Sequence, residues 1–150
     1  MRWTHLGHAG WLVETADVRV LFDPLLGETY HDGVFEVFPR RRVDIASLRP
    51  DIVVVTHRHP DHFDLESLAA LAALGSARLL LTADELVARS ARRLGFPEVQ
   101  VLGNLQHRVF GGTKLLPTPS FCDVVEWGMI VATEDGTVWN QVDSVLDGPD

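Results

Sequence analysis

The stretch VVVTHRHPDHFD, residues 53–64, decides the fold, because it joins the end of an apolar run to a dense cluster of polar side chains. Residues 51–55 are continuously apolar apart from the first, which predicts a strand covered on both faces. Ligands commonly bind at the carboxyl ends of such strands. Four side chains that can bind metal follow within six residues, namely His57, His59, Asp61 and His62.

A solvated turn would explain any one of these histidines, but it does not explain four candidate ligands placed directly after a buried strand. Neutral imidazoles and carboxylates are the ligands that borderline divalent metals prefer. Side chains two positions apart in a tight loop can converge on one point. The sequence therefore predicts a metal-binding loop at residues 57–62.

Composition predicts a single domain and excludes several classes of partner. The chain has 150 residues, of which 46% are hydrophobic, and a formal net charge of −8, so we expect no binding to nucleic acid or to anionic lipid. The one cysteine excludes an internal disulfide and fits a reducing compartment. The N-terminal residues lack the pattern of a signal peptide, and no apolar run has the length of a membrane span, so we expect a cytoplasmic protein.

The order of the expected elements predicts an α+β domain. Apolar runs separated by glycines predict a meander of three strands, followed by a long loop over residues 25–50. A strand–helix–strand–helix–strand segment comes next, with its helices expected at residues 65–74 and 83–94. Four more strands are expected after it, at residues 109–110, 114–117, 124–133 and 137–142. This order predicts a layered sheet with helices on one face.

The histidine loop resembles the HxHxDH signature of the metallo-β-lactamase superfamily. The segments HLGHAGW, residues 5–11, and VLFDP, residues 20–24, resemble the opening of the branch that contains ascorbate-phosphate lactonase and N-acyl-phosphatidylethanolamine phospholipase D. This resemblance implies a four-layer αββα fold. The 150 residues would form one domain that holds the first half and the start of the second sheet, incomplete at its C-terminus.

The resemblance also assigns roles to single residues. His57 and His59 would bind one divalent metal ion, and Asp61 and His62 a second. Asp143 would bridge the two ions, and Asp61 would also orient the nucleophile as a catalytic residue. Asp23 would hold a metal-binding histidine from behind through a hydrogen bond. His8 lies in a glycine-rich turn, either beside the ligand or on the surface. Zinc is the default metal, with iron and manganese as alternatives.

The chain departs from the family at two expected histidines. The family pattern Thr-Pro-x-x-His is TPSFC here, residues 118–122, so Cys122 stands where a ligand is expected. A thiolate can bind zinc or iron, but a free cysteine is often only a small buried residue, and Asp123 is an alternative ligand. Glu126 and Trp127 are expected at the same rim. The last histidine of the family has no counterpart, so we expect a homodimer or a second chain that completes the fold.

Three functions are compatible with this pattern. The first is a metal-dependent hydrolase that uses water activated by two metal ions on a small-molecule ester, thioester, lactone or phosphoester. The second is a diiron, oxygen-dependent oxidoreductase on the same fold. The third is a non-catalytic or half-site subunit, although retention of all four clustered ligands argues against simple decay.

Overall fold

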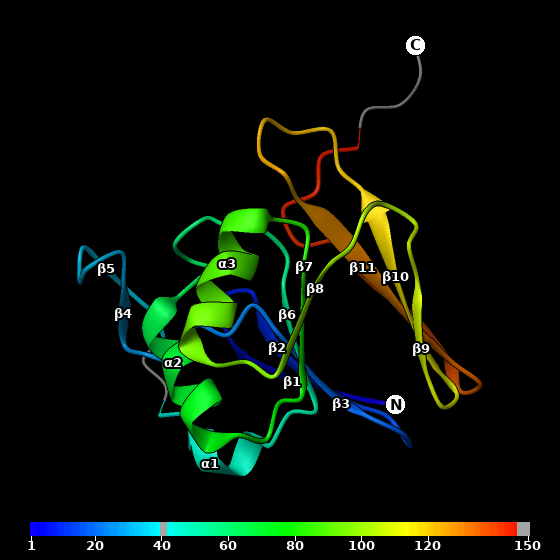
Figure 1. The fold of residues 1–150 in the computed structure, drawn as a ribbon, viewed down its shortest axis with the longest axis horizontal. Helices are drawn as coiled ribbons and strands as arrows, with labels where there is room; N and C mark the ends of the chain where they lie inside the picture. The colour runs from blue at the N-terminus through cyan, green and yellow to red at the C-terminus, as the bar shows by residue number, and fades with distance from the viewer. Residues whose placement is uncertain (40–41, 147–150) are drawn as a thin grey trace.

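Two β-sheets and two main helices form the structure, a computed structural model that describes residues 1–39 and 42–146 (Figure 1). The larger sheet has the strand order β1-β2-β3-β6-β7-β8, and the smaller has the order β12-β11-β10-β9. The strands of the larger sheet are β1 (Arg2–Gly7), β2 (Gly10–Glu14), β3 (Arg19–Phe22), β6 (Ile52–Val55), β7 (Leu79–Thr82) and β8 (Glu98–Val101). Those of the smaller are β9 (Arg108–Phe110), β10 (Thr113–Pro119), β11 (Trp127–Thr133) and β12 (Gly136–Asn140).

The centre of the larger sheet is parallel and fully covered. β1, β2 and β3 form the predicted antiparallel meander, and β3, β6, β7 and β8 then run parallel. Every residue of β6 and β7 is buried, which confirms the two-sided cover predicted from the apolar run. The carboxyl ends of β3 and β6 therefore lie side by side at one edge of the sheet, with Phe22 opposite Val54.

The two main helices begin and end at residues with clear capping chemistry. α2 (Leu65–Leu74) starts after Asp64, whose carboxylate accepts a hydrogen bond from the Ser67 backbone at 2.9 Å, and it stops at Gly75 in the left-handed region. α3 (Glu85–Leu94) is capped by Asp84 and ends at Gly95 in the same way. Both helices occur as predicted, although α3 begins two residues later because Asp84 takes the capping position.

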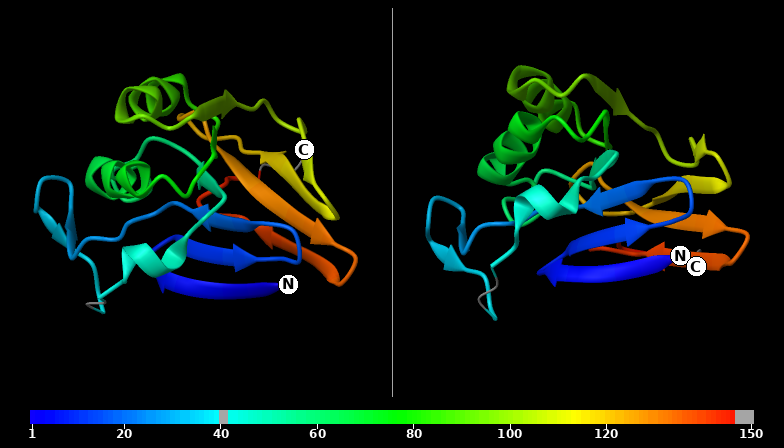
Figure 2. Two further views of the ribbon diagram at one scale, coloured as in Figure 1. Left: turned by 60° about the horizontal axis from the view of Figure 1, so that its bottom comes forward. Right: turned by 90° about the horizontal axis from the view of Figure 1, so that it is seen from below.

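Two apolar clusters separate the structure into three layers. The helices, the larger sheet and the smaller sheet lie one over another in Figure 2. One cluster joins the helices to the larger sheet, and the other fills the space between the two sheets. Trp127 belongs to the second cluster, where its indole Nε1 donates to the Leu102 carbonyl at 3.1 Å. The described residues thus form the helix, sheet and sheet layers of the expected four-layer fold. None of the helices in these residues is long and apolar enough to cross a membrane.

The segment expected to be one long loop contains structure of its own. Residues 29–36 form a short hairpin from β4 (Thr29–Tyr30) and β5 (Phe35–Glu36), which projects from the body in Figure 1. α1 (Ile45–Leu48) follows, with Asp44 as its cap. Neither element has a periodic pattern, because the hairpin has two residues a strand and the helix is one turn long.

The last two strands are shorter than predicted. β11 begins at Trp127 rather than residue 124, and β12 ends at Asn140 rather than residue 142. Val142 has a φ of 57°, a left-handed conformation that a strand cannot contain. Asp143 therefore lies in a turn beyond the sheet and not at a strand end.

We expect Leu80→Ala to lower the free energy of unfolding by about 2–5 kcal/mol, because Leu80 is fully buried in the central strand β7 and its truncation leaves a cavity. Leu86→Ala is the matched control, since Leu86 lies half exposed on α3 and should cost less than about 1 kcal/mol. Urea unfolding measures both. Equal losses for the two variants would contradict the assignment of Leu80 to the core.

Candidate metal centre

The histidine loop folds back on itself directly after β6. The backbone amides of His62 and Phe63 both donate to the His59 carbonyl, at 3.0 and 2.8 Å. This tight turn returns the chain to its starting point, so that the rings of His57 and His62 lie 4.1 Å apart between centroids. Both imidazoles are almost fully buried, although histidine usually remains partly exposed.

Asp23 ties this loop to the neighbouring strand. It follows β3, its amide donates to the Val54 carbonyl at 2.8 Å, and its side chain is completely buried. Oδ1 accepts from the Thr56 amide at 2.8 Å, and Oδ2 accepts from the Thr56 hydroxyl at 2.9 Å. Nδ1 of His62 lies 3.1 Å from the same Oδ2. One carboxylate therefore receives three hydrogen bonds from the loop.

These bonds determine which nitrogen of each buried imidazole carries the hydrogen. An ionised carboxylate only accepts, so Nδ1 of His62 is the donor to Asp23. The single hydroxyl hydrogen of Thr56 is also donated to Asp23, so Thr56 Oγ1 accepts from Nδ1 of His57 at 3.1 Å. Both histidines consequently hold a hydrogen on Nδ1 and leave the lone pair of Nε2 free to bind a ligand.

The two Nε2 atoms face carboxylates from other parts of the chain. Asp143 Oδ2 lies 3.4 Å from Nε2 of His62 and 3.9 Å from Nε2 of His57. Asp61 Oδ2 lies 3.5 Å from Nε2 of His62, and it accepts a hydrogen bond from His8 at 2.7 Å. His8 has a φ of 48°, which turns its ring toward the loop from the β1–β2 connection.

Two overlapping groups of side chains can therefore each hold a metal ion. One consists of His57, His62 and Asp143, and the other of His8, Asp61 and His62, with the ligand atoms of each group within 4.8 Å of one another. Imidazole nitrogens and carboxylate oxygens suit zinc, iron or manganese. Because both groups use the single Nε2 lone pair of His62, they can be filled by one ion at a time, and the imidazole and carboxylate donors there suit a divalent ion of the kind that the resemblance implies.

Electrostatic effects in the cluster differ from residue to residue. Burial, with the neighbouring His62, lowers the pKa of His57, so its imidazole is neutral at neutral pH, as a metal ligand must be. Burial also acts to lower the pKa of His62, but the hydrogen bond and charge of Asp23 outweigh it and raise the pKa. A metal must therefore compete with a proton at His62. For Asp61 burial opposes the charge, yet the hydrogen bond from His8 lowers the pKa overall.

His59 lies at the edge of this cluster. Its ring is exposed, and its Nδ1 lies 2.9 Å from Nε2 of His57. Because that Nε2 has a lone pair, Nδ1 of His59 is the donor in this contact. His59 belongs to neither group of three within the described residues, but its Nδ1 lies next to the Nε2 lone pair of His57.

Cys122 and Asp123 lie outside both groups of potential ligands in the part of the chain that the structure describes. The Cys122 thiol donates to the carbonyl of Val124 at 3.1 Å, within its own loop, and Asp123 is exposed. Their roles as ligands stay predictions. The sequence predicts Trp127 at the rim of the site. Its side chain packs between the two sheets instead.

Glu126 is closer to the centre than the sequence indicates. Its side chain is almost fully buried, and Oε2 lies 3.9 Å from Nδ1 of His57. The sequence places an acid beside a large apolar residue here, a pattern that predicts only a strand entry. The burial of this acid depends on the packing of the two sheets, which local sequence patterns do not show.

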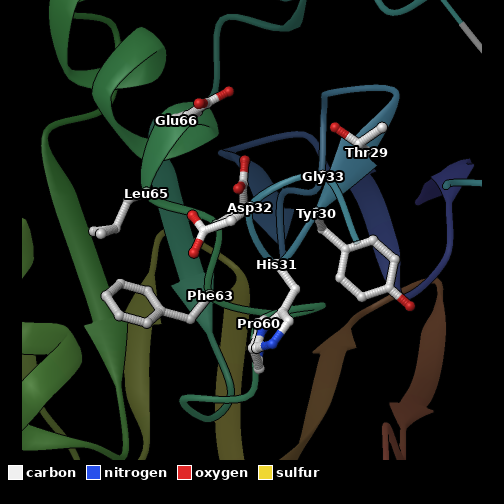
Figure 3. Close-up of a pocket in the computed structure, with 10 residues that line it drawn as sticks. Thr29, Tyr30, His31, Asp32, Gly33, Pro60, Phe63, Leu65 and Glu66 are labelled. Carbon is white, nitrogen blue, oxygen red and sulfur yellow. The ribbon is translucent and has the colours of Figure 1, made fainter. Parts of the chain in front are cut away.

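Two hollows open beside the cluster. One has a volume of about 390 Å³ and contains potential ligands in its wall, since it is lined by His8, Ala9, Trp11, His62, Asn140, Val142 and Asp143. The other, of about 260 Å³, is bounded by His31 and Asp32 of the β4–β5 hairpin and by Phe63 and Leu65 at the entry to α2 (Figure 3). Tyr30 also lines this second hollow, and its ring centroid lies 5.7 Å from that of His8.

The two stacked sheets, with helices on the outer face of the larger one, form a metallo-β-lactamase-like fold. The family model described as the beta-lactamase superfamily domain matches residues 2–144, and the chain belongs to this family.

Similar proteins come from several organisms. A UPF0173 metal-dependent hydrolase of Salinibacter ruber is 39% identical over 69 residues, which cover 45% of this chain and 26% of that protein. Another, from Pyrobaculum arsenaticum, is 27% identical over 97% of this chain and 62% of its own length. Among solved structures, the diiron β-hydroxylase CmlA of Streptomyces venezuelae has a TM-score of 0.78 at 22% identity, over 98% of this chain and 30% of CmlA. The chain thus spans less than two thirds of each of these proteins.

We expect Asp23→Asn to lower the pKa of His62, because Asp23 raises this pKa through its hydrogen bond and its charge. Titration of the metal-free protein followed by NMR of the imidazole signals measures the shift. Glu98→Gln, which removes a charge from the edge strand β8, is the control and should leave His62 unchanged. An unaltered His62 titration in the Asp23 variant would show that the carboxylate does not set its protonation.

Proposed function

We propose that the protein is a metal-dependent hydrolase whose centre lies between the histidine loop and Asp143. The observation that carries this proposal is the pair of buried imidazoles whose Nε2 lone pairs face one carboxylate. A solvated turn would not need buried histidines with fixed tautomers. The naming of two relatives as metal-dependent hydrolases supports the same reading.

In this proposal His57 and His59 hold one divalent ion, Asp61 and His62 hold the second, and Asp143 lies between them. Zinc is the expected metal. Such a pair of ions lowers the pKa of a bound water and polarises an ester, thioester, lactone or phosphoester. Asp23 and Thr56 keep the hydrogens of His57 and His62 on Nδ1, away from the ligand side.

Asp61 has a second role in the proposal. Its low pKa keeps the carboxylate ionised at neutral pH, and the hydrogen bond from His8 fixes the orientation of Oδ2. An ionised, fixed carboxylate can accept a hydrogen bond from the attacking nucleophile and so orient it. The adjoining hollows and Tyr30 are suited to a small-molecule substrate. We retain the lactonase and phospholipase D-like branch as a prediction about its class.

We expect His59→Ala to reduce bound metal by at least half, because it removes one of the two imidazoles that hold the first ion. His59 is exposed, so its loss should not disturb folding. Elemental analysis of protein purified without added metal, together with hydrolysis of a panel of esters, lactones and phosphoesters, measures the effect.

His107→Ala is the matched control, since His107 is also exposed and lies in the loop before β9. It should keep full metal content and activity. Survival of both properties in the His59 variant would refute the proposed centre.

A diiron, oxygen-dependent oxidoreductase is the second candidate. Carboxylates from Asp61 and Asp143 face the imidazoles, and such oxygen-rich sites suit iron as well as zinc. The fold also resembles that of a diiron β-hydroxylase. The same elemental analysis separates the candidates: iron with a visible absorption band would favour the oxidoreductase, and zinc the hydrolase.

We further propose that residues outside this chain complete the centre, through a homodimer or a second polypeptide. Each potential ligand group of the described residues supplies three side chains, and Cys122 is not among them. A half-site subunit is the limiting case of this proposal. Sedimentation should show an assembly larger than 16.7 kDa, and a stable, fully metal-loaded monomer would argue against it. The single cysteine and acidic charge favour a cytoplasmic location.

A further inference from the structure

Glu126 is a buried acid that the proposed reaction does not use. It lies at the end of the loop between β10 and β11, on the side of the smaller sheet. Its Oε1 accepts a hydrogen bond from the Ser120 hydroxyl, and Ser120 accepts in turn from the amide of Val145 at 2.9 Å. These contacts fix the carboxylate, so that Oε2 is the oxygen that faces the histidine loop.

The position of Glu126 relative to His57 repeats the position of Asp23 relative to His62. Nδ1 of His62 lies 3.1 Å from Asp23, and Nδ1 of His57 lies 3.9 Å from Glu126. Each buried imidazole therefore has a buried carboxylate behind Nδ1, while its Nε2 faces Asp143. The two carboxylates come from different sheets, so the repetition does not follow from a shared turn.

Glu126 does not have the partners that a stabilising buried acid needs. Burying a carboxylate costs free energy unless a cation and several hydrogen bonds compensate. Within the described residues its one ion-pair contact is with His57, at 3.9 Å, and it accepts a hydrogen bond from Ser120. The negative charge of Glu126 is therefore better explained by an effect on the neighbouring His57 than by a contribution to the stability of the metal-free fold.

We propose that Glu126 is a positioning residue for the metal centre, which stabilises the hydrogen on Nδ1 of His57 and so keeps the Nε2 lone pair directed at the metal. Thr56 holds that hydrogen by a direct bond, and Glu126 adds the negative charge behind it. A negative charge at this position makes Nε2 a stronger donor to a cation. The inference rests on the proposed metal centre but concerns a residue outside its ligand set.

Glu126→Gln tests the proposal, because it removes the charge and keeps the size of the side chain. Zinc affinity is measured by competition between Zn²⁺ and a chromophoric chelator. We expect the zinc dissociation constant to rise about tenfold to a hundredfold, with the number of zinc ions at saturation unchanged. NMR of the metal-free variant should show a smaller fraction of His57 with its hydrogen on Nδ1.

A second measurement separates positioning from a purely structural role. The urea midpoint of the metal-free Glu126→Gln variant should stay equal to that of the wild type or increase, since an uncompensated buried charge has been removed. Glu98→Gln on the exposed strand β8 should change neither the midpoint nor the zinc affinity. Ser120→Ala frees Oε1 while keeping the acid, and should weaken zinc binding in the same direction but less.

The possible results divide clearly. Unchanged zinc affinity in both Glu126→Gln and Ser120→Ala would overturn the inference, and so would a lower metal-free midpoint with an unaltered His57 tautomer. Loss of one zinc ion at saturation would make Glu126 a ligand and would also overturn it. Failure of the wild type to bind zinc or iron would instead refute the proposed centre itself.

Discussion

The carboxylate of Asp23 is the contact on which the arrangement of the whole site depends. It receives the backbone and hydroxyl of Thr56 and the ring of His62, so it joins the end of β3 to the end of β6. The parallel pairing of these strands brings the two ends together, and their apolar runs are typical of strands buried in a parallel sheet. Without this anion the buried polar atoms of Thr56 and His62 would have no acceptor, at a cost of about 1–3 kcal/mol for each group.

The same contact makes the site rigid before any ligand arrives. Positive φ angles at His8, Asp23 and Val142 show that the backbone adopts costly conformations around the centre. Such conformations persist only where surrounding contacts enforce them. The buried hydrogen bonds of Asp23 and the core beneath β6 provide these contacts, so the fold itself holds these side chains in place.

Much of this arrangement can be read from the sequence, since it depends on local patterns. The helix at residues 65–74 is predicted to the residue because an aspartate and a glycine mark its ends. The histidine loop is predicted because its four candidate metal-binding side chains lie within six residues of one another. The fold class follows from the family resemblance, which the match over residues 2–144 confirms.

What could not be predicted depends on contacts between distant segments. The burial of Glu126 follows from the packing of the smaller sheet on the larger one, and the turn at Asp143 follows from the backbone of Val142. The β4–β5 hairpin is too short to show a period. The role of Cys122 as a ligand rests on analogy with another residue type and stays a prediction, and its thiol bonds to a carbonyl of its own loop.

The centre also connects two layers that are otherwise held together by apolar contact and by a few hydrogen bonds, such as those from Trp127 to Leu102 and from Thr113 to Thr15. Its histidines leave the larger sheet, whereas Asp143 and Glu126 belong to segments beside the smaller one. A cation held between them would cross-link the two sheets. Metal binding would then stabilise the contact between the two sheets, by a free energy that grows with the logarithm of the free metal concentration. The bound metal would thus restrict relative movement of the two sheets at their interface.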